Sequence, residues 1–270
     1  MPARANLVEI FSSVQGEGPD VGAATLFLRF GGCDLRCTWC DSPHTWRPAR
    51  HCRIEQHPGA GDFRHAPNPL PLDDALAAAR ALHIESHRFA SLTGGEPLLQ
   101  PAAVAQLARA LRAAGLALHL ETHGLHADAL AGALPHLDVV SMDWKLASDV
   151  RRADAAGAPG DPGASGAPED SGASQFHEAH RRFLSVARAA PRVVVKLVIS
   201  AASRGEEIRA ACDGVAEIHP RACVVLQPVT PFAGVQPPAA SRVLELQRQA
   251  AARLPDVRVI PQTHKLWGAH

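Results

Sequence analysis

The chain has 270 residues, of which 46% are hydrophobic, so it can build one large α/β domain or two small ones with a sizeable core. Its 27 lysine and arginine residues balance its 27 aspartate and glutamate residues, which gives a formal net charge of zero. This balance argues against a strongly basic nucleic-acid binder and against a polybasic membrane-binding surface, so a small-molecule ligand fits better.

The amino-terminal segment lacks the long apolar core of a signal peptide, and no uninterrupted apolar stretch is long enough to span a bilayer. We therefore expect a cytoplasmic location, where thiols stay reduced and structural disulfides are rare. The scattered cysteines Cys52, Cys212 and Cys223 are then expected to be buried or bystander thiols.

Short apolar runs alternate with helical patterns along most of the chain. The runs predicted as strands are, in chain order, 24–30, 88–93, 116–122, 137–143, 192–200, 223–229 and 257–262. The patterns predicted as helices are 72–82, 101–115, 176–189, 206–218 and 240–254. Such alternation implies parallel strands joined by right-handed crossovers, either in an open, incomplete β/α barrel or in a doubly wound sheet. In both architectures we expect the functional groups at the carboxyl ends of the strands.

One segment breaks this alternation. Residues 153–174 are mostly alanine, glycine, proline and serine, with hardly any bulky apolar side chain. Such a segment cannot bury enough surface to offset the entropy lost on ordering it. We therefore expect a disordered insert within a single domain that spans residues 1–270.

Three of the six cysteines, Cys33, Cys37 and Cys40, lie within eight positions directly after the predicted strand 24–30. A redox dithiol would need only the last two of them. A zinc site would need a fourth ligand, for which the candidates nearest in sequence are His44, His51 and Cys52. Three thiolates are one short of the four that fill a 4Fe–4S cluster, which leaves one iron open to a small ligand. The spacing favours an iron–sulfur cluster and leaves zinc as the alternative.

The Cys-x-x-x-Cys-x-x-Cys spacing in the loop after the first predicted strand resembles the signature of the radical S-adenosylmethionine (SAM) superfamily. In that superfamily the open iron binds the amino and carboxylate groups of SAM, and one electron from the cluster yields a radical that abstracts hydrogen from the substrate. A second stretch, "SLTGGEPLL" at 91–99, agrees with this resemblance. Its glycines allow close approach of the main chain, and the superfamily's "GGE" faces the SAM amino group.

The stretch 11–46 resembles the amino-terminal region of the 7-carboxy-7-deazaguanine synthase family, on the pathway to queuosine and other deazapurines. The telling parts are "QGEG" at 15–18, the arginine of "FLRF" and the "WCDS" that contains the last cysteine. Further matches, in order along the chain, are "ETHG" (121–124), "SMDWKLAS" (141–148), "VVKLVI" (194–199), "LQPV" (226–229) and "IPQTHK" (260–265).

This resemblance implies an incomplete, TIM-like β/α barrel of the radical SAM type with parallel strands. It implies a lyase that converts 6-carboxy-5,6,7,8-tetrahydropterin to 7-carboxy-7-deazaguanine with loss of ammonia, through hydrogen abstraction at C6 and ring contraction. The implied cofactors are a 4Fe–4S cluster, SAM and Mg²⁺. The implied partners are a flavodoxin or ferredoxin as reductant and a second copy of the chain in a homodimer.

The resemblance also assigns roles to single residues. It gives the cluster to Cys33, Cys37 and Cys40, and Mg²⁺ to the hydroxyl of Ser42. It gives SAM binding to Trp39, Asp41, Gly95, Glu96, Ser141, Lys145 and Gln227. It gives substrate binding to Gln15, Gly16, Glu17, Arg29 and Thr93. Gln15 and Glu17 match the amide and amine edge of a pterin, and the Arg29 guanidinium matches its carboxylate.

Structural alternatives stay open for several of these residues. Arg29 could be one end of a structural salt bridge, and Lys145 could pair with Asp143. The segment with His264 and Lys265 could reach the substrate or form a solvated tail.

One residue departs from the family pattern: His123 stands where the resemblance predicts asparagine.

Two other functions stay open. A glycyl-radical activating enzyme is the alternative within the superfamily. A zinc-binding structural module, colourless and without affinity for SAM, is the alternative outside it.

Overall fold

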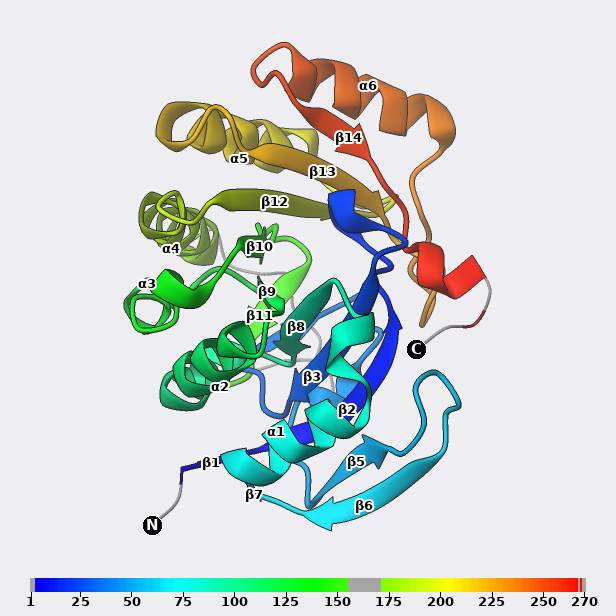
Figure 1. Ribbon diagram of the computed structural model, residues 1–270. Helices are drawn as coiled ribbons and strands as arrows, with labels where there is room; N and C mark the ends of the chain where they lie inside the picture. The colour runs from blue at the N-terminus through cyan, green and yellow to red at the C-terminus, as the bar shows by residue number, and fades with distance from the viewer. Residues whose placement is uncertain (1–2, 155–170, 267, 269–270) are drawn as a thin grey trace.

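The computed structural model describes residues 3–154, 171–266 and 268, and one ten-stranded sheet passes through it (Figure 1). In spatial order its strands are β14 (Val257–Val259), β13 (Cys223–Pro228), β12 (Arg192–Ile199), β10 (Val139–Asp143), β9 (Ala117–Thr122), β8 (Phe89–Gly94), β3 (Ala24–Phe30), β2 (Leu7–Val14), β5 (His51–Glu55) and β6 (Phe63–Pro67).

All seven predicted strands are present, from β3 to β14, and each is parallel to its neighbours among the seven. They lie side by side in the order of the sequence, and this order never reverses. A doubly wound sheet needs such a reversal, because helices must then cover both faces. Sequential order with right-handed crossovers instead gives an open β/α barrel, as the resemblance implied.

The connecting helices follow one another in a row beside the strands (Figure 1). They are α1 (Leu72–Ala81), α2 (Pro101–Ala113), α3 (Ala127–Leu130), α4 (Ser171–Ala187), α5 (Gly205–Ile218) and α6 (Ala240–Ala251). Helix α2 shows why such segments fold: proline opens it, and Val104, Leu107 and Leu111 recur at helical spacing and are fully buried. Each such side chain contributes about 1.5–3 kcal/mol when it leaves water.

Sequence reasoning did not predict strand β2 or the β5–β6 hairpin. Strand β2 runs antiparallel to β3 and extends the sheet beyond the barrel-like part. Two short antiparallel pairs lie outside the main sheet: β1 (Arg4–Ala5) with β7 (Leu70–Pro71), and β4 (Leu35–Cys37) with β11 (Val150–Arg152). Single 3₁₀ turns occur at Gly18–Asp20, Pro43–Thr45, Ile84–Ser86, Pro97–Leu99, Leu134–His136 and Thr263–Leu266.

The predicted insert 153–174 lies mostly outside the described residues, since 155–170 are not described. Its expected carboxyl-terminal boundary is wrong, because helix α4 already begins at Ser171. A helix that is nucleated in its amphipathic part extends at small cost into the residues that precede it. Within the described residues, no helix has the length and apolarity needed to cross a bilayer.

Candidate active site

A cavity of about 360 Å³ opens where strands β8, β9, β10, β12 and β13 end. A neighbouring cavity of about 230 Å³ shares seven of its lining residues: Glu17, Arg29, Asp41, Ser42, Thr93, Glu121 and Lys265. The two are therefore parts of one continuous site at the carboxyl ends of the parallel strands, which is where the sequence predicted functional groups.

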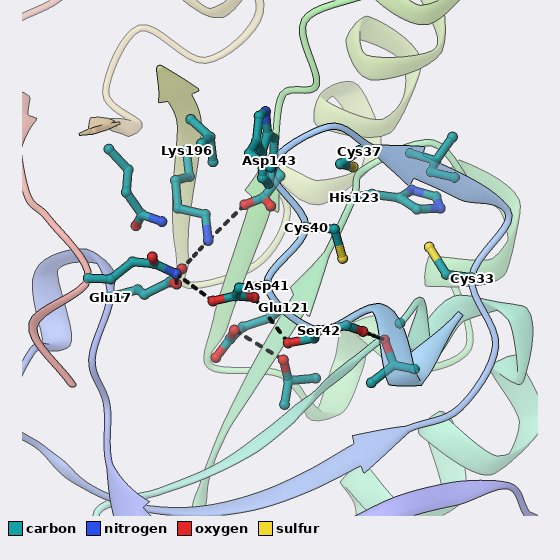
Figure 2. Close-up of a pocket in the computed structure, with 18 of the residues that line it drawn as sticks. Glu17, Cys33, Cys37, Cys40, Asp41, Ser42, Glu121, His123, Asp143 and Lys196 are labelled. Atoms are coloured by element: carbon teal, nitrogen blue, oxygen red, sulfur yellow. Dashed lines mark hydrogen bonds and ion pairs between the residues drawn. The ribbon is translucent and has the colours of Figure 1, made fainter. Parts of the chain in front are cut away.

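The three cysteines of the loop after β3 line one end of this site (Figure 2). Backbone contacts with the segment at β11 hold this loop in place. Val150 of β11 pairs with Cys37, and Thr38 N donates to Asp149 O at 2.9 Å. The Arg36 guanidinium adds hydrogen bonds to the carbonyls of Cys33 and Leu35, at 3.0 and 2.8 Å. All three cysteines are free thiols, so no disulfide holds the loop.

The spacing of the thiols in space fits a cluster better than a single zinc ion. The sulfurs of Cys33, Cys37 and Cys40 do not all lie within 4.8 Å of one another. Zinc bound tetrahedrally at about 2.3 Å would bring thiolates to about 3.8 Å from each other. Burial raises the pKa of Cys33 to about 11 and that of Cys37 to about 12, so a cationic partner is needed to keep them as thiolates. A polynuclear iron site supplies both the larger span and the positive charge.

The "GGE" motif presents main chain to the cavity but turns its carboxylate away. Gly94 and Gly95 line the cavity, and a Cβ on Gly95 would lie 2.2 Å from Gly32 O, so only glycine fits. Glu96 is completely buried and accepts hydrogen bonds from Thr122 Oγ1 and from the backbone N–H of His123 and Leu98. The Glu96 carboxylate, predicted to contact SAM, therefore does not line the cavity, because the turn itself uses its oxygens.

The other residues predicted for SAM divide into two groups. Trp39, Asp41, Lys145 and Gln227 line the cavity. Lys145 Nζ lies 4.5 Å from the centre of the Trp39 ring, and Gln227 Oε1 is buried without a hydrogen-bond partner. An unpaired buried acceptor that faces a cavity is available to a ligand. Ser141, in contrast, is buried within β10 and does not line the site.

Asp143 is shared by two lysines. Its Oδ2 lies 2.7 Å from Lys145 Nζ and its Oδ1 lies 3.1 Å from Lys196 Nζ. The predicted alternative that Lys145 pairs with Asp143 is thus confirmed, and Lys145 nevertheless faces the cavity. Burial alone would lower the pKa of both lysines, but the carboxylate of Asp143 raises it above the ordinary value, so both stay charged.

The residues predicted for the substrate lie at the other end of the site. Glu17 accepts a hydrogen bond from Gln262 Nε2 at 2.8 Å and pairs with Lys196. Gln15 is almost completely buried, donates to Glu121 Oε1 at 2.9 Å and accepts from Glu17 N at 3.0 Å. Its side-chain amide is therefore occupied in holding the 15–17 segment. Gln15 and Gly16 line the smaller cavity, and Glu17 lines both cavities.

Arg29 takes part in the salt bridge that the sequence left as its structural alternative. Its Nε lies 2.7 Å from Glu9 Oε1, and the two residues are cross-strand partners on β3 and β2. Arg29 still lines both cavities. Thr93 lines them too, and its hydroxyl donates to Glu121 Oε2 at 3.1 Å.

Asp41 and Ser42 place oxygen ligands together at the middle of the site (Figure 2). Ser42 Oγ donates to Asp41 Oδ1 at 3.0 Å, and Asp41 Oδ2 accepts from Gln262 and Lys265. Burial would raise the pKa of Asp41, but Lys265, Gln262 and Ser42 hold it at about 2. Adjacent hydroxyl and carboxylate oxygens are what Mg²⁺ prefers, so these two residues fit that ion.

The segment that contains His264 and Lys265 is not a free tail. Thr263 N donates to Gly16 O at 2.8 Å, and a Cβ on Gly16 would lie 2.0 Å from His264 Nδ1. Gly16 therefore permits close approach of the segment 262–265, and Lys265 reaches into both cavities.

Several residues that line the cavity were not assigned a role from the sequence, among them Lys196, Glu121 and Gln262. Each of these three lies inside a sequence stretch that matched the family, but the resemblance assigned no role to the residue itself. Lys196 carried the clearest signal, as a single charge in the apolar run "VVVKLVI".

Asp34, His123 and His126 bring potential metal-ligating atoms within 4.8 Å of one another. Their contacts explain the cluster without a metal: His123 Nε2 lies 2.8 Å from Asp34 Oδ1, and Arg152 and His126 approach the other carboxylate oxygen at 3.3 and 3.2 Å. His123, found where asparagine was expected, thus ties the cysteine loop to the end of β9.

Comparison with known proteins gives the family to which the chain belongs. The family model described as the radical SAM superfamily matches residues 28–158. The chain is 37% identical to 7-carboxy-7-deazaguanine synthase of Geobacter sulfurreducens over 98% of this chain and 97% of that protein. It is 32% identical to the Methanopyrus kandleri protein of the same name, over 97% and 92% of the two chains.

Two solved structures have a similar fold. QueE from Escherichia coli has a TM-score of 0.59 and 20% identity, with coverage of 97% of this chain and 95% of that one. A radical SAM methyltransferase from Sphaerobacter thermophilus has a TM-score of 0.57 and 16% identity, with coverage of 91% and 67%. The chain therefore belongs to the 7-carboxy-7-deazaguanine synthase family of the radical SAM superfamily, and it is a lyase of deazapurine biosynthesis that uses a 4Fe–4S cluster, SAM and Mg²⁺.

Proposed function

We propose that the chain converts 6-carboxy-5,6,7,8-tetrahydropterin to 7-carboxy-7-deazaguanine with loss of ammonia. The observation that carries this proposal is one continuous cavity with three free thiols at one end and Glu17, Arg29 and Thr93 at the other. The carboxylate of Glu17 complements the amine donors of a pterin edge, and a guanidinium complements a carboxylate.

Cys33, Cys37 and Cys40 would hold the cluster, which together with SAM supplies the radical that abstracts hydrogen from the substrate. The backbone of Gly94 and Gly95 leaves room for close approach at this end of the cavity. The face of Trp39 and the unpaired oxygen of Gln227 would orient SAM, and the Lys145 ammonium would attract its carboxylate.

Glu17 would accept hydrogen bonds from the pterin, while Gln15 fixes the 15–17 segment from behind. Arg29 binds Glu9 through Nε, which leaves its two terminal nitrogens as donors for a substrate carboxylate. Thr93 would add a contact from the end of β8. This arrangement binds the substrate at both ends and limits the orientations that its reacting carbon can adopt.

Ser42 and Asp41 would bind Mg²⁺ next to the substrate carboxylate, where a hard cation offsets negative charge. The segment 262–265 covers this part of the site through Gln262, which donates to both Glu17 and Asp41, and through Lys265. Covering the cavity in this way excludes water, which would otherwise compete for a reactive intermediate.

We further propose that the chain works in the cytoplasm as one domain of residues 1–270, as a homodimer, with a flavodoxin or ferredoxin as electron donor. Support for a reducing compartment comes from the six cysteines, all of which are free. Sedimentation of the reconstituted protein tests the dimer, and turnover with each purified donor tests the reductant.

The decisive experiment is anaerobic reconstitution with iron and sulfide, followed by incubation with reductant, SAM, Mg²⁺ and 6-carboxytetrahydropterin and by mass spectrometry of the products. We expect 7-carboxy-7-deazaguanine, with SAM not consumed in proportion to product. Formation of 5′-deoxyadenosine alone would retain the radical chemistry and reject the substrate.

A further inference from the structure

We propose that Lys196 couples the two ends of the cavity, so that a pterin bound at Glu17 tightens the binding of SAM beside the cysteines. This inference rests on the proposed function, since it takes the pterin and SAM as the two ligands. It gives a positioning role to a residue to which the family resemblance assigned none.

A line of alternating charges joins the two ends (Figure 2). Lys196, on β12, pairs with Glu17 Oε2 and lies 3.1 Å from Asp143 Oδ1. The other oxygen of Asp143 lies 2.7 Å from Lys145 Nζ, which in turn lies over the Trp39 ring. Glu17 belongs to the substrate end and Lys145 to the SAM end, so Lys196 and Asp143 are the two links between them.

Little water separates these charges. The side chains of Lys145 and Lys196 are 8% and 10% exposed, and those of Asp143 and Glu17 are both 19% exposed. Charges in such surroundings are screened much less than charges at a surface. A change of partner at Glu17 therefore changes the electrostatic interaction of Lys196 with Asp143, and in turn that of Asp143 with Lys145.

The direction of the coupling follows from the competition for each carboxylate. The amine donors of a pterin compete with Lys196 for Glu17. Lys196 then has Asp143 as its remaining salt-bridge partner among the described residues, with Glu121 as a more distant negative charge. An Asp143 carboxylate held more closely by Lys196 holds Lys145 less closely. The Lys145 ammonium is then free to bind the carboxylate of SAM, so the two ligands favour each other.

Two neighbouring groups do not provide the same link. Gln262 also binds Glu17, but its amide is neutral and its other contact in this region is Asp41. Glu121 is satisfied by hydrogen bonds from Gln15, Ser91 and Thr93. Lys196 is the residue that touches both Glu17 and the carboxylate shared with Lys145.

The test is calorimetric titration of SAM into the reconstituted holoenzyme with the cluster left oxidised, so that no turnover occurs. Each titration is done with Mg²⁺, with and without saturating 6-carboxytetrahydropterin. For the unaltered chain we expect SAM to bind about tenfold more tightly with the pterin present. For Lys196→Met the difference should fall to within about twofold, and Lys196→Arg, which keeps the charge, should restore part of it.

Lys265→Met is the matched control, because it also removes a cavity lysine but one that pairs with Asp41 rather than Asp143. It should keep the coupling whatever it does to the separate affinities. Titration of the pterin with and without SAM must give the same factor, since coupling is reciprocal.

One of the two overturning results needs no variant. Equal SAM affinity with and without bound pterin in the unaltered chain overturns the inference, as does an undiminished factor in folded Lys196→Met. A holoenzyme that binds SAM but no pterin overturns the proposed function, and with it the inference. The two failures are thus distinguished by whether the pterin binds.

Discussion

The two ends of the cavity are built in different ways. At the substrate end the charged side chains have partners from the protein itself: Glu17 pairs with Lys196, and Arg29 pairs with Glu9. At the cysteine end the protein supplies three free thiols whose pKa values are raised by burial at Cys33 and Cys37. The comparison teaches that the substrate end is organised by the chain alone, whereas the cysteine end is completed only by its cofactor.

The largest expected effect separates the two ends. Cys37→Ala should abolish the cluster and all turnover, because two thiolates cannot hold the four irons. Pterin binding measured without SAM should survive, since the substrate end does not depend on the cluster. Iron and sulfide analysis, visible absorption and calorimetry check this result.

The control is Cys212→Ala, which removes a buried thiol from α5 that does not line the cavity. It should keep the cluster and lose about 1 kcal/mol of unfolding free energy. If Cys37→Ala also lost pterin binding while it remained folded, the conclusion that the chain alone organises the substrate end would be refuted.

Arg29→Ala addresses the substrate end. Loss of the guanidinium should weaken pterin binding by about 2 kcal/mol or more, roughly 30-fold, because the substrate carboxylate loses its partner and Glu9 keeps only the more distant Arg53. Cleavage of SAM without substrate should persist. Calorimetry with the pterin and detection of 5′-deoxyadenosine give the two readouts.

Arg53→Ala is its matched control, because Arg53 approaches the same Glu9 at 3.4 Å but does not line either cavity. Its pterin affinity should stay within about twofold of the unaltered chain. Equal losses in the two variants would show that Arg29 acts only through Glu9 and not on the substrate.

A smaller effect is expected from Gly16→Ala, which tests the covering segment. The added Cβ would collide with His264 and weaken the hydrogen bonds from Thr263 to Gly16 O. We expect KM for the pterin to rise about tenfold, which corresponds to the loss of a hydrogen bond worth about 1.4 kcal/mol.

Gly132→Ala is a suitable control, because its Cβ would meet only Ala105 Cβ at 3.8 Å. Its KM should not change. An unchanged KM in Gly16→Ala would mean that the segment does not contribute to substrate binding.

The smallest effect concerns the support behind the SAM end. His180 is completely buried, and its Nε2 lies 3.1 Å from Lys145 N. Burial lowers the pKa of His180 to about 3, with a further lowering by His123. The unfolded chain therefore binds one more proton than the folded chain between the ordinary histidine pKa of about 6.5 and about 3.

Stability must then decrease as pH falls through that range, by up to about 1.4 kcal/mol per pH unit from this group. Urea unfolding of the unaltered chain and of His180→Gln, at about pH 7.5 and about pH 5.5, isolates this contribution. The variant should lose less stability on acidification. Identical losses in both proteins would contradict a buried neutral His180.

Much of the fold was predictable because the seven parallel strands are apolar runs that alternate with amphipathic helices. The cysteine loop, Glu17 and Lys145 were placed at the cavity by motif. What the sequence did not reveal was which residue pairs with Arg29. Arg29 meets Glu9 because β2 lies antiparallel beside β3, and that strand had not been predicted.

The sequence motifs also did not predict the direction in which a side chain points. Glu96 turns inward because Thr122 and two backbone N–H groups converge on its carboxylate, and this convergence exists only once β9 lies next to β8. Lys196 shows the same limit: a lysine in an apolar strand signals a role, but the carboxylates that define the role come from distant parts of the chain.

The contact between Gln262 and Glu17 spans 245 residues of sequence. Contacts of such separation cost more loop-closure entropy than local contacts do. They can also open locally while the sheet stays intact, since few hydrogen bonds hold the segment 262–265 in place. The same few contacts that finish the cavity can therefore serve as its entrance, so that a ligand can enter and leave without any change in the strands that carry the chemistry.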